Sequence, residues 1–208
     1  AIAWAKQHQR DLRLIDQAEF SQLEPAAAHP PAQGLWMPHV GQVRNPRIAK
    51  ALHADLVRRN VEIMTHTPVD ELVCRNNRCT GVRIGTQHIE ADQVVVCAGA
   101  WSAQLLNGFS APPSVRPIRG QMILFKTTPG TIQRITLEEQ RYIIPRRDGH
   151  VLFGSCMEDV GFDKSTTSEL YQELYDIVIE RFPVLRHFPV VKHWAGLRPS
   201  SPAGVPYI

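Results

Sequence analysis

The sequence has no unbroken apolar run of the ~20 residues that a helix needs to cross a bilayer, and no signal-peptide pattern opens it. It also lacks a strong charge of one sign, because the formal net charge is +3 and the lysines and arginines are scattered. Proteins that bind nucleic acid concentrate basic residues on one face or one helix. We therefore expect neither a membrane nor a nucleic acid as a partner, and a cytoplasmic location.

Cysteine is scarce, and the four that occur (Cys74, Cys79, Cys97 and Cys156) include no Cys-x-x-Cys pair. Four are too few for a disulfide scaffold, and the nine histidines include no His-Glu-x-x-His pattern. No metal site is expected, and the cysteines are expected to be reduced thiols. A Gly-x-Ser-x-Gly turn is also missing, which speaks against a serine hydrolase.

The chain does have the composition of a globular α+β protein, with 43% hydrophobic and 21% charged residues. A helix is predicted over residues 1–9, and a second one begins at Asp16, paired with Glu19, and ends before Pro25. After an extended stretch over 34–43, Asn45 is expected to cap a helix that starts at Pro46. A strand at 61–65 follows, and strand, helix, strand indicates a parallel sheet.

The helix that starts at Pro46 is amphipathic, because Ile48, Leu52 and Leu56 recur every four residues and form one apolar face. Residues 68–91 predict a small antiparallel meander. The second half of the chain is mostly strands, at 115–128, 141–146, 150–157 and 190–199. It has one amphipathic helix over 165–182, with Thr166 and Glu169 as a capping box.

The segment Asp-Gln-Val-Val-Val-Cys-Ala-Gly-Ala-Trp-Ser, residues 92–102, predicts a strand buried on both faces, with Cys97 as a small hydrophobic residue inside it. The strand ends in Ala98, Gly99 and Ala100, and Trp101 follows. One interpretation is a plain strand-to-helix turn at Gly99. The other is that a flat, phosphorylated ligand passes close to this backbone, where a side chain would block it.

Two other segments are candidates for chemistry. Arg198 stands between Gly196 and Pro199, and a proline holds the residue before it in an extended conformation. Such an arginine can bind a carboxylate with two parallel hydrogen bonds, or it can be a surface arginine paired with a nearby acid. In the hairpin over 141–157, Tyr142 and Met157 can line an apolar pocket or simply pack in the core.

Taken together, seven segments resemble the flavin-dependent D-amino acid oxidase superfamily, and within it the glycine oxidases of the thiamine pathway. In chain order they are EFSQLEP, GQVRNPRIAKAL, HTPV, DQVVVCAGAWS, VRPIRGQMILF, YIIPRRDGHVLFGS and WAGLRPSSPAGVPYI. The resemblance implies FAD as the cofactor. It implies that Arg198 binds the substrate carboxylate, that Tyr142 is its hydroxyl partner, and that Met157 lies beside the flavin. The residues implied to contact FAD are Val69, Ala98, Gly99, Trp101, Gly196 and Leu197.

The same resemblance implies a domain organisation. Residues 1–34 and 108–195 would form a substrate-binding domain with a mixed or antiparallel sheet and flanking helices. Residues 35–107 and 196–208 would form an incomplete piece of a Rossmann-like FAD-binding domain. The family's Gly-x-Gly-x-x-Gly and its C-terminal flavin-binding segment have no match here, so we expect an internal fragment that does not hold FAD alone. Ala203 stands where the family has aspartate, which puts the turn after Pro199 in doubt.

The activity that the resemblance implies for the full-length protein is oxidative deamination of glycine or a small D-amino acid. Hydride passes from the substrate to the flavin, the imino acid hydrolyses, and molecular oxygen is reduced to hydrogen peroxide. The resemblance also implies a homo-oligomer. Three alternatives stay open: an amino acid dehydrogenase that reduces a quinone or carrier, the flavin half of a tRNA-modifying enzyme, and a degenerate binding module.

Overall fold

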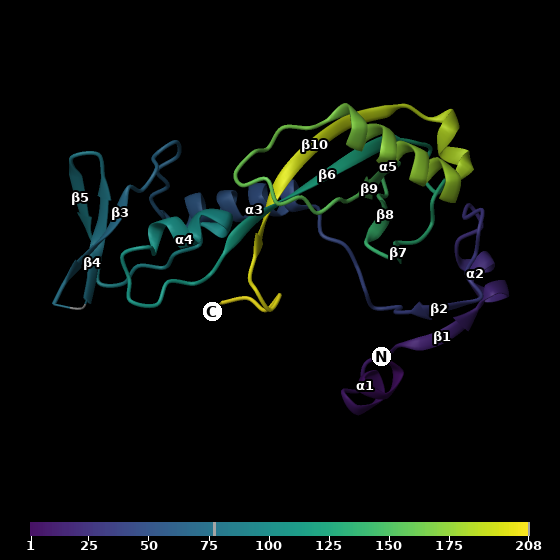
Figure 1. Cartoon of the computed structure of the whole chain (residues 1–208), viewed down its shortest axis with the longest axis horizontal. Helices are drawn as coiled ribbons and strands as arrows, with labels where there is room; N and C mark the ends of the chain where they lie inside the picture. The colour runs from purple at the N-terminus through teal and green to yellow at the C-terminus, as the bar shows by residue number, and fades with distance from the viewer. Residues whose placement is uncertain (77, 208) are drawn as a thin grey trace. The chain divides into compact units, whose positions relative to one another are not determined.

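The computed structural model describes residues 1–76 and 78–207, and Figure 1 traces the chain from purple at the N-terminus to yellow at the C-terminus. Two compact units make up the chain, and each is built from two stretches of sequence. The first unit comprises Ala1–Gln42 and Arg119–Leu197, and the second comprises Val43–Ile118 and Arg198–Ile208. The chain therefore passes between the units three times, once after Gln42 and twice within strands, β6 (Arg116–Lys126) and β10 (Val190–Ser200).

The first unit contains a five-stranded sheet with the strand order β10-β6-β9-β8-β7. Strand β9 pairs antiparallel with both β6 and β8, and this register puts Tyr142 opposite Gly154. The strands are β6 (Arg116–Lys126), β7 (Thr136–Glu138), β8 (Arg141–Pro145), β9 (His150–Gly154) and β10 (Val190–Ser200). All five were expected from the sequence except the short β7.

The turn between β8 and β9 depends on a glycine, as the Arg-Asp-Gly sequence predicts. Gly149 has a φ of +80°, which side-chain-bearing residues rarely adopt. A Cβ atom at this position would also collide with the carbonyl oxygen of Thr127. Glycine is therefore the one residue type that closes the hairpin carrying Tyr142 without strain.

Helix α5 (Ser168–Arg181) packs its apolar side against this sheet and completes the core of the first unit. From the helix come Leu174, Val178 and Ile179, and from the strands come Ile123, Phe125, Ile143, Val151 and Phe153. One end is closed by Phe182, just before the short helix η2 (Pro183–His187), and by Leu185 within it. Every one of these side chains is buried, so the predicted amphipathic helix and the apolar strands account for the core.

The N-terminal part of the first unit contains α1 (Ile2–Gln7), α2 (Gln17–Leu23) and a two-stranded antiparallel ribbon of β1 (Arg13–Asp16) and β2 (Gln33–Trp36). The Asp16 side chain accepts a hydrogen bond from the amide of Glu19 at 2.9 Å, which confirms the predicted cap of α2. Helix α1 and the end of α2 before Pro25 also agree with the sequence prediction.

A buried carboxylate joins the end of α2 to the loop before β7. Glu24 is 1% exposed, and its Oε2 accepts hydrogen bonds from the amides of Gln133 and Arg134, both at 2.7 Å. Its other oxygen, Oε1, accepts from the amide of Ala26 at 3.3 Å. Hydrogen bonds from three backbone amides compensate the cost of removing this charge from water.

The second unit contains α3 (Asn45–Arg58), a three-stranded antiparallel meander, the short helix η1 (Gly99–Trp101) and α4 (Ser102–Leu105). The meander consists of β3 (Glu71–Arg75), β4 (Arg78–Ile84) and β5 (Gln87–Glu90) and confirms the prediction for residues 68–91. Gly81 is required at its centre, because a Cβ atom there would collide with the carbonyl oxygen of Ile89.

Two predicted strands are not formed. Residues 61–65 and residues 92–98 carry no strand, and Val95 is 83% exposed instead of buried. A strand of a parallel sheet exists only when neighbouring strands satisfy its backbone groups. In the described residues neither segment has such a neighbour. The apolar face of α3 is likewise uncovered, with Leu52 59% exposed, and Cys97 is an exposed thiol instead of a buried one.

Two helix caps differ from the prediction by one residue. Helix α3 includes Asn45, and Arg44 takes the cap position without a side-chain hydrogen bond. Helix α5 is capped by Thr167 instead of Thr166, because the Thr167 hydroxyl accepts from the amide of Leu170 at 3.4 Å. Both sequences offer two neighbouring polar residues, and the pattern alone does not decide between them.

Candidate functional site

Tyr142 lies on β8 and is half-buried, with Met122 of β6 beneath its hydroxyl. The hydroxyl donates to the sulfur of Met122 at 3.8 Å. A thioether is a weak acceptor, so this contact orients the phenol without using up its capacity to donate to a better partner. Tyr142 is therefore in a position to offer a hydroxyl donor on an apolar surface.

Met157 follows β9, three residues after the glycine that faces Tyr142 across the strand pair. Its side chain is 61% exposed, whereas Ser155 and Cys156 just before it are buried. The segment thus buries its polar groups and leaves an apolar, flexible side chain at the surface. Met157 and Tyr142 belong to the same unit, with Tyr142 on β8 and Met157 just after the neighbouring strand β9.

A buried arginine holds the segment that carries Met157. Arg119 on β6 is 4% exposed, and its backbone forms two hydrogen bonds with the backbone of Glu158, at 2.9 and 3.0 Å. Its guanidinium donates from Nε and Nη2 to the two oxygens of the Glu158 carboxylate, at 3.0 and 2.8 Å. Nη1 donates to Asp163 at 2.6 Å and to the Ser165 hydroxyl at 3.1 Å. One guanidinium therefore links β6 to both halves of the connection between β9 and α5.

The hydrogen bonds from Arg119 lower the pKa of Glu158 to about 2. Partial burial opposes this shift, and smaller hydrogen bonds from Cys156 and Gln121 add to it. Glu158 consequently stays ionised over the whole physiological pH range. Because Arg119 bears a single charge and faces two carboxylates, the cluster carries a net negative charge.

Gln121 extends this cluster toward β10 and α5. Its amide nitrogen donates to Glu158 at 3.1 Å, and its amide oxygen lies 3.0 Å from Nε2 of His193. The same oxygen accepts from the amide of Thr167 at 3.1 Å, so a neutral His193 with its proton on Nε2 satisfies both groups. Burial lowers the pKa of His193, which favours this neutral form.

Arg198, Gly196 and Leu197 all lie on β10, as the sequence predicts. Arg198 is exposed, and the strand holds it in the extended conformation expected for a residue before proline. No atom lies within 4 Å of the position that a Cβ of Gly196 would occupy. Leu197 belongs to the first unit and Arg198 to the second, so the boundary between the units falls within β10.

The segment expected to contact a flavin lies in the second unit. Gly99 has a φ of +54°, and no atom lies within 4 Å of where its Cβ would stand. Ala98 and Val69 are half-buried outside any strand, and Trp101 is 41% exposed at the end of η1. The backbone at Gly99 is thus open to the close approach of a flat ligand, which fits a dinucleotide.

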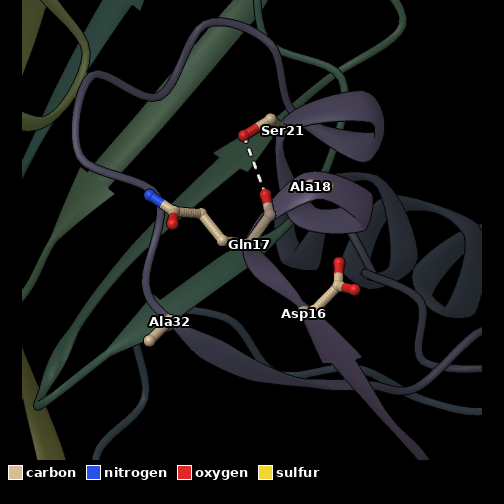
Figure 2. Close-up of a pocket in the computed structure, with 5 residues that line it drawn as sticks. All are labelled: Asp16, Gln17, Ala18, Ser21 and Ala32. Atoms are coloured by element: carbon tan, nitrogen blue, oxygen red, sulfur yellow. Dashed lines mark hydrogen bonds between the residues drawn. The ribbon is translucent and has the colours of Figure 1, made fainter.

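A surface pocket beside the start of α2 contains none of these residues. Figure 2 shows its lining by Asp16, Gln17, Ala18, Ser21 and Ala32, and the Ser21 hydroxyl donates to the carbonyl of Gln17 at 2.9 Å. These polar groups serve the helix itself. In the part of the chain that the structure describes, no cluster of His, Cys, Asp and Glu could hold a metal ion, and no helix is long and apolar enough to cross a membrane.

Sequence reasoning missed the cluster around Arg119. The sequence does contain a signal for this cluster. Arg119 and Gln121 are polar residues inside a predicted strand whose other residues are mostly apolar. A charged residue at such a position is rarely buried without a partner. The partners Glu158 and Asp163 lie about 40 residues away in irregular segments, and no local pattern identifies them.

The family model for FAD-dependent oxidoreductases, DAO, matches residues 1–208, the whole chain. The chain belongs to this family. The chain spans 57% of the length of the two curated relatives described next.

Among these relatives, the glycine oxidase of Pseudomonas putida is 41% identical over 209 residues, which cover all of this chain. The glycine oxidase of Pseudomonas aeruginosa is 40% identical over the same span. A solved structure of glycine oxidase from Bacillus cereus superposes with a TM-score of 0.89 over 99% of this chain and 58% of that one, at 24% identity. That structural similarity confirms the expected fold.

Proposed function

We propose that the full-length protein oxidises glycine or another small amino acid, with FAD as cofactor and molecular oxygen as electron acceptor. The observation that carries this proposal is the 41% identity over the entire chain to a protein named glycine oxidase. Membership in the FAD-dependent oxidoreductase family supports the choice of cofactor. The first unit is assigned mainly to substrate binding and the second mainly to FAD binding. The exceptions lie on β10, where Gly196 and Leu197 of the first unit are assigned to FAD and Arg198 of the second unit to the substrate.

Arg198 is assigned to the substrate carboxylate. It stands in an Ala-Gly-Leu-Arg-Pro sequence on β10, where the strand and Pro199 fix its backbone. A guanidinium donates two parallel hydrogen bonds to a carboxylate, which fixes both the position and the orientation of a small amino acid. This orientation is the main contribution that the chain's own residues make to the reaction.

Tyr142 and Met157 are assigned to the pocket that receives the rest of the substrate. Among the described residues the acceptor of the Tyr142 hydroxyl is a thioether, so the hydroxyl can donate to a ligand oxygen instead. Met157 is exposed and can supply an apolar wall that excludes water, while the Arg119–Glu158 pair holds its backbone. No side-chain general base is needed if the amine binds in its neutral form.

FAD, when bound, supplies the acceptor for the two electrons that leave the substrate. The residues proposed to hold it are Val69, Ala98, Gly99, Trp101, Gly196 and Leu197. The open backbone at Gly99 and at Gly196 is the structural feature that suits them to this role. The thiamine pathway, a cytoplasmic location and a homo-oligomeric state are parts of the same proposal.

A peroxide assay on the full-length, FAD-loaded protein tests the proposal. Glycine, sarcosine, D-alanine and D-proline are supplied separately in air, and hydrogen peroxide and oxygen uptake are measured, with L-glutamate as a control for nonspecific turnover. We expect peroxide with at least one of the four. Silence with all four would overturn the proposal, and substrate-dependent dye reduction without peroxide would show a dehydrogenase instead.

A further inference from the structure

Cys74 and Cys79 face each other across the β3–β4 hairpin. They are a directly opposed pair in the antiparallel register, next to the pair Arg75 and Arg78 at the turn. Directly opposed residues point to the same face of the sheet, and their Cα atoms are about 4.5–5.5 Å apart. Disulfides join Cα atoms at about 4.4–6.8 Å. The two thiols therefore meet the first geometric requirement for a bond between them.

We propose that Cys74 and Cys79 form a reversible disulfide with hydrogen peroxide as the oxidant, which makes the hairpin a redox-modification site. Both residues are free thiols in the structure, Cys74 exposed and Cys79 half-buried. The proposal goes beyond the proposed oxidase activity and does not depend on it, because the peroxide can come from any source.

The hairpin has the local freedom that closing the bond requires. A disulfide brings the Cβ atoms to about 3.5–4.5 Å, slightly closer than the usual spacing of opposed residues. The register shifts between Val73 and Cys74, because Val73 pairs with Gly81 and leaves Thr80 as an extra residue. Such a bulge increases the local twist and interrupts the ladder beside the cysteine pair. A small approach of the two side chains is thus possible without breaking the meander.

The surroundings of the pair determine how the reaction proceeds. Partial burial, followed by the neighbouring Cys79 thiol, raises the pKa of Cys74, so only a small fraction is thiolate at neutral pH. A surface pocket lined by Arg75, Arg78, Cys79, Thr80, Glu90, Ala91 and Asp92 gives a small molecule access to the second thiol. We expect slow but complete oxidation that accelerates as the pH rises.

The chemistry is balanced in two steps. The more exposed thiolate, that of Cys74, attacks one oxygen of hydrogen peroxide, so that the O–O bond breaks and a sulfenic acid and hydroxide form. The Cys79 thiolate then attacks the Cys74 sulfur, the S–S bond forms, and hydroxide leaves. With two protons from the thiols, the net reaction converts two thiols and one peroxide into one disulfide and two waters. Both sulfurs are oxidised and the peroxide is reduced.

The two remaining cysteines serve as internal comparators. Cys97 is an exposed thiol outside the hairpin. Cys156 is buried and donates to Glu158 at 3.1 Å, and burial raises the pKa of its thiol above the usual value. A thiol that has no second thiol opposite it stops at the sulfenic acid or proceeds irreversibly to the sulfinic acid. A sulfenic acid is also reduced by dithiothreitol, so the loss of two hydrogens on forming the S–S bond, and not recovery by the reductant alone, separates the hairpin pair from Cys97.

The test is differential alkylation of the full-length protein. It is incubated with hydrogen peroxide, alkylated with iodoacetamide, reduced with dithiothreitol, labelled with a second alkylating reagent and analysed by peptide mass spectrometry. We expect Cys74 and Cys79 to be protected together, to be recovered together by dithiothreitol, and to yield a peptide lighter by two hydrogens before reduction. In Cys74→Ser and in Cys79→Ser, the peptide lighter by two hydrogens should no longer appear, because the remaining thiol has no partner in the hairpin.

The proposal is overturned if both thiols stay fully alkylatable after peroxide, if they oxidise independently to sulfinic acids, or if a non-reducing gel shows that they link two chains. Differential alkylation of the unsubstituted protein tests the proposal even if a serine variant fails to fold. This measurement requires no oxidation of an amino acid by the protein. Failure here would therefore leave the proposed oxidase activity untouched, and failure of the peroxide assay would leave this proposal standing.

Discussion

Arg119 and Glu158 are joined by four hydrogen bonds, two between their backbones and two between the guanidinium and the carboxylate. The arginine side chain is 5% exposed and the glutamate side chain is 21% exposed. A bidentate pair in such surroundings is both strong and geometrically specific. It fixes the start of the long connection from β9 to α5, and with it the backbone on either side of Met157.

Removing the arginine should therefore destabilise the first unit strongly. In Arg119→Met, the partly buried Glu158 and the exposed Asp163 lose their cation, and removing one partner of a buried pair such as Arg119–Glu158 costs about 3–5 kcal/mol. Arg119→Lys should recover only part of this loss, because an ammonium cannot reproduce the fork. Urea unfolding followed by far-UV circular dichroism measures the change.

The matched control is Arg147→Met on the exposed turn between β8 and β9. A surface substitution of this kind changes stability by about 0.5 kcal/mol or less. If Arg119→Met were as mild as this control, the cluster around Arg119 would have no role in holding the structure together.

The acid stability of the protein should depend on Glu158. Its pKa is about 2 in the folded protein and 4.5 in its ordinary state, so the unfolded chain binds the proton more readily between these values. The stabilisation is therefore fully present above pH 4.5 and is lost as the pH falls toward 2. In Glu158→Gln this part of the pH dependence should disappear, which urea unfolding at a series of pH values from neutral downward will show.

His193 adds a second dependence of the same sign at higher pH. Burial lowers its pKa from 6.5, so the neutral form stabilises the fold and this contribution declines as the pH falls below that value. Glu158→Gln should keep this part of the curve. A Glu158→Gln profile that follows the unsubstituted protein below pH 4.5 would contradict the assigned role of the carboxylate.

Glu24 should be nearly as important as Arg119, although its partners are backbone amides and not a cation. Glu24→Ala removes the acceptor of two part-buried hydrogen bonds, from the amides of Gln133 and Arg134, and each lost hydrogen bond to a charged group costs about 1–3 kcal/mol. Glu24→Gln keeps one oxygen and should lose less. Glu180→Ala, an exposed position on α5, is the control that should leave the unfolding midpoint nearly unchanged.

Local patterns predicted the elements that stabilise themselves. The cap at Asp16, the Arg-Asp-Gly turn and the meander over residues 68–91 depend on neighbours in the sequence, and all three formed as expected. The family resemblance was likewise carried by short segments, and the family model confirms it.

The elements that failed to form depend on distant partners. The valine run at 92–98 has the composition of a buried strand, but a strand needs paired edges, and its own sequence does not supply them. Arg119 shows the converse. Its burial depends on Glu158 and Asp163, which lie in irregular segments far along the chain. The sequence therefore shows a charged residue in an apolar strand, but it does not show which residues pair with it.

The carboxylate assignment of Arg198 can be tested directly in the full-length, FAD-loaded protein, by measuring kcat/KM for glycine and bound flavin on the same preparation of Arg198→Ala. Truncating one partner of a charge-assisted bidentate pair costs on the order of 2–5 kcal/mol, which corresponds to a loss of roughly 30- to several-thousand-fold. We expect a loss of this size with flavin content unchanged, partial recovery in Arg198→Lys, and normal activity in the surface control Arg186→Ala. Activity of Arg198→Ala within a few-fold of the unsubstituted protein would show that Arg198 is a surface residue and that the substrate carboxylate is held elsewhere.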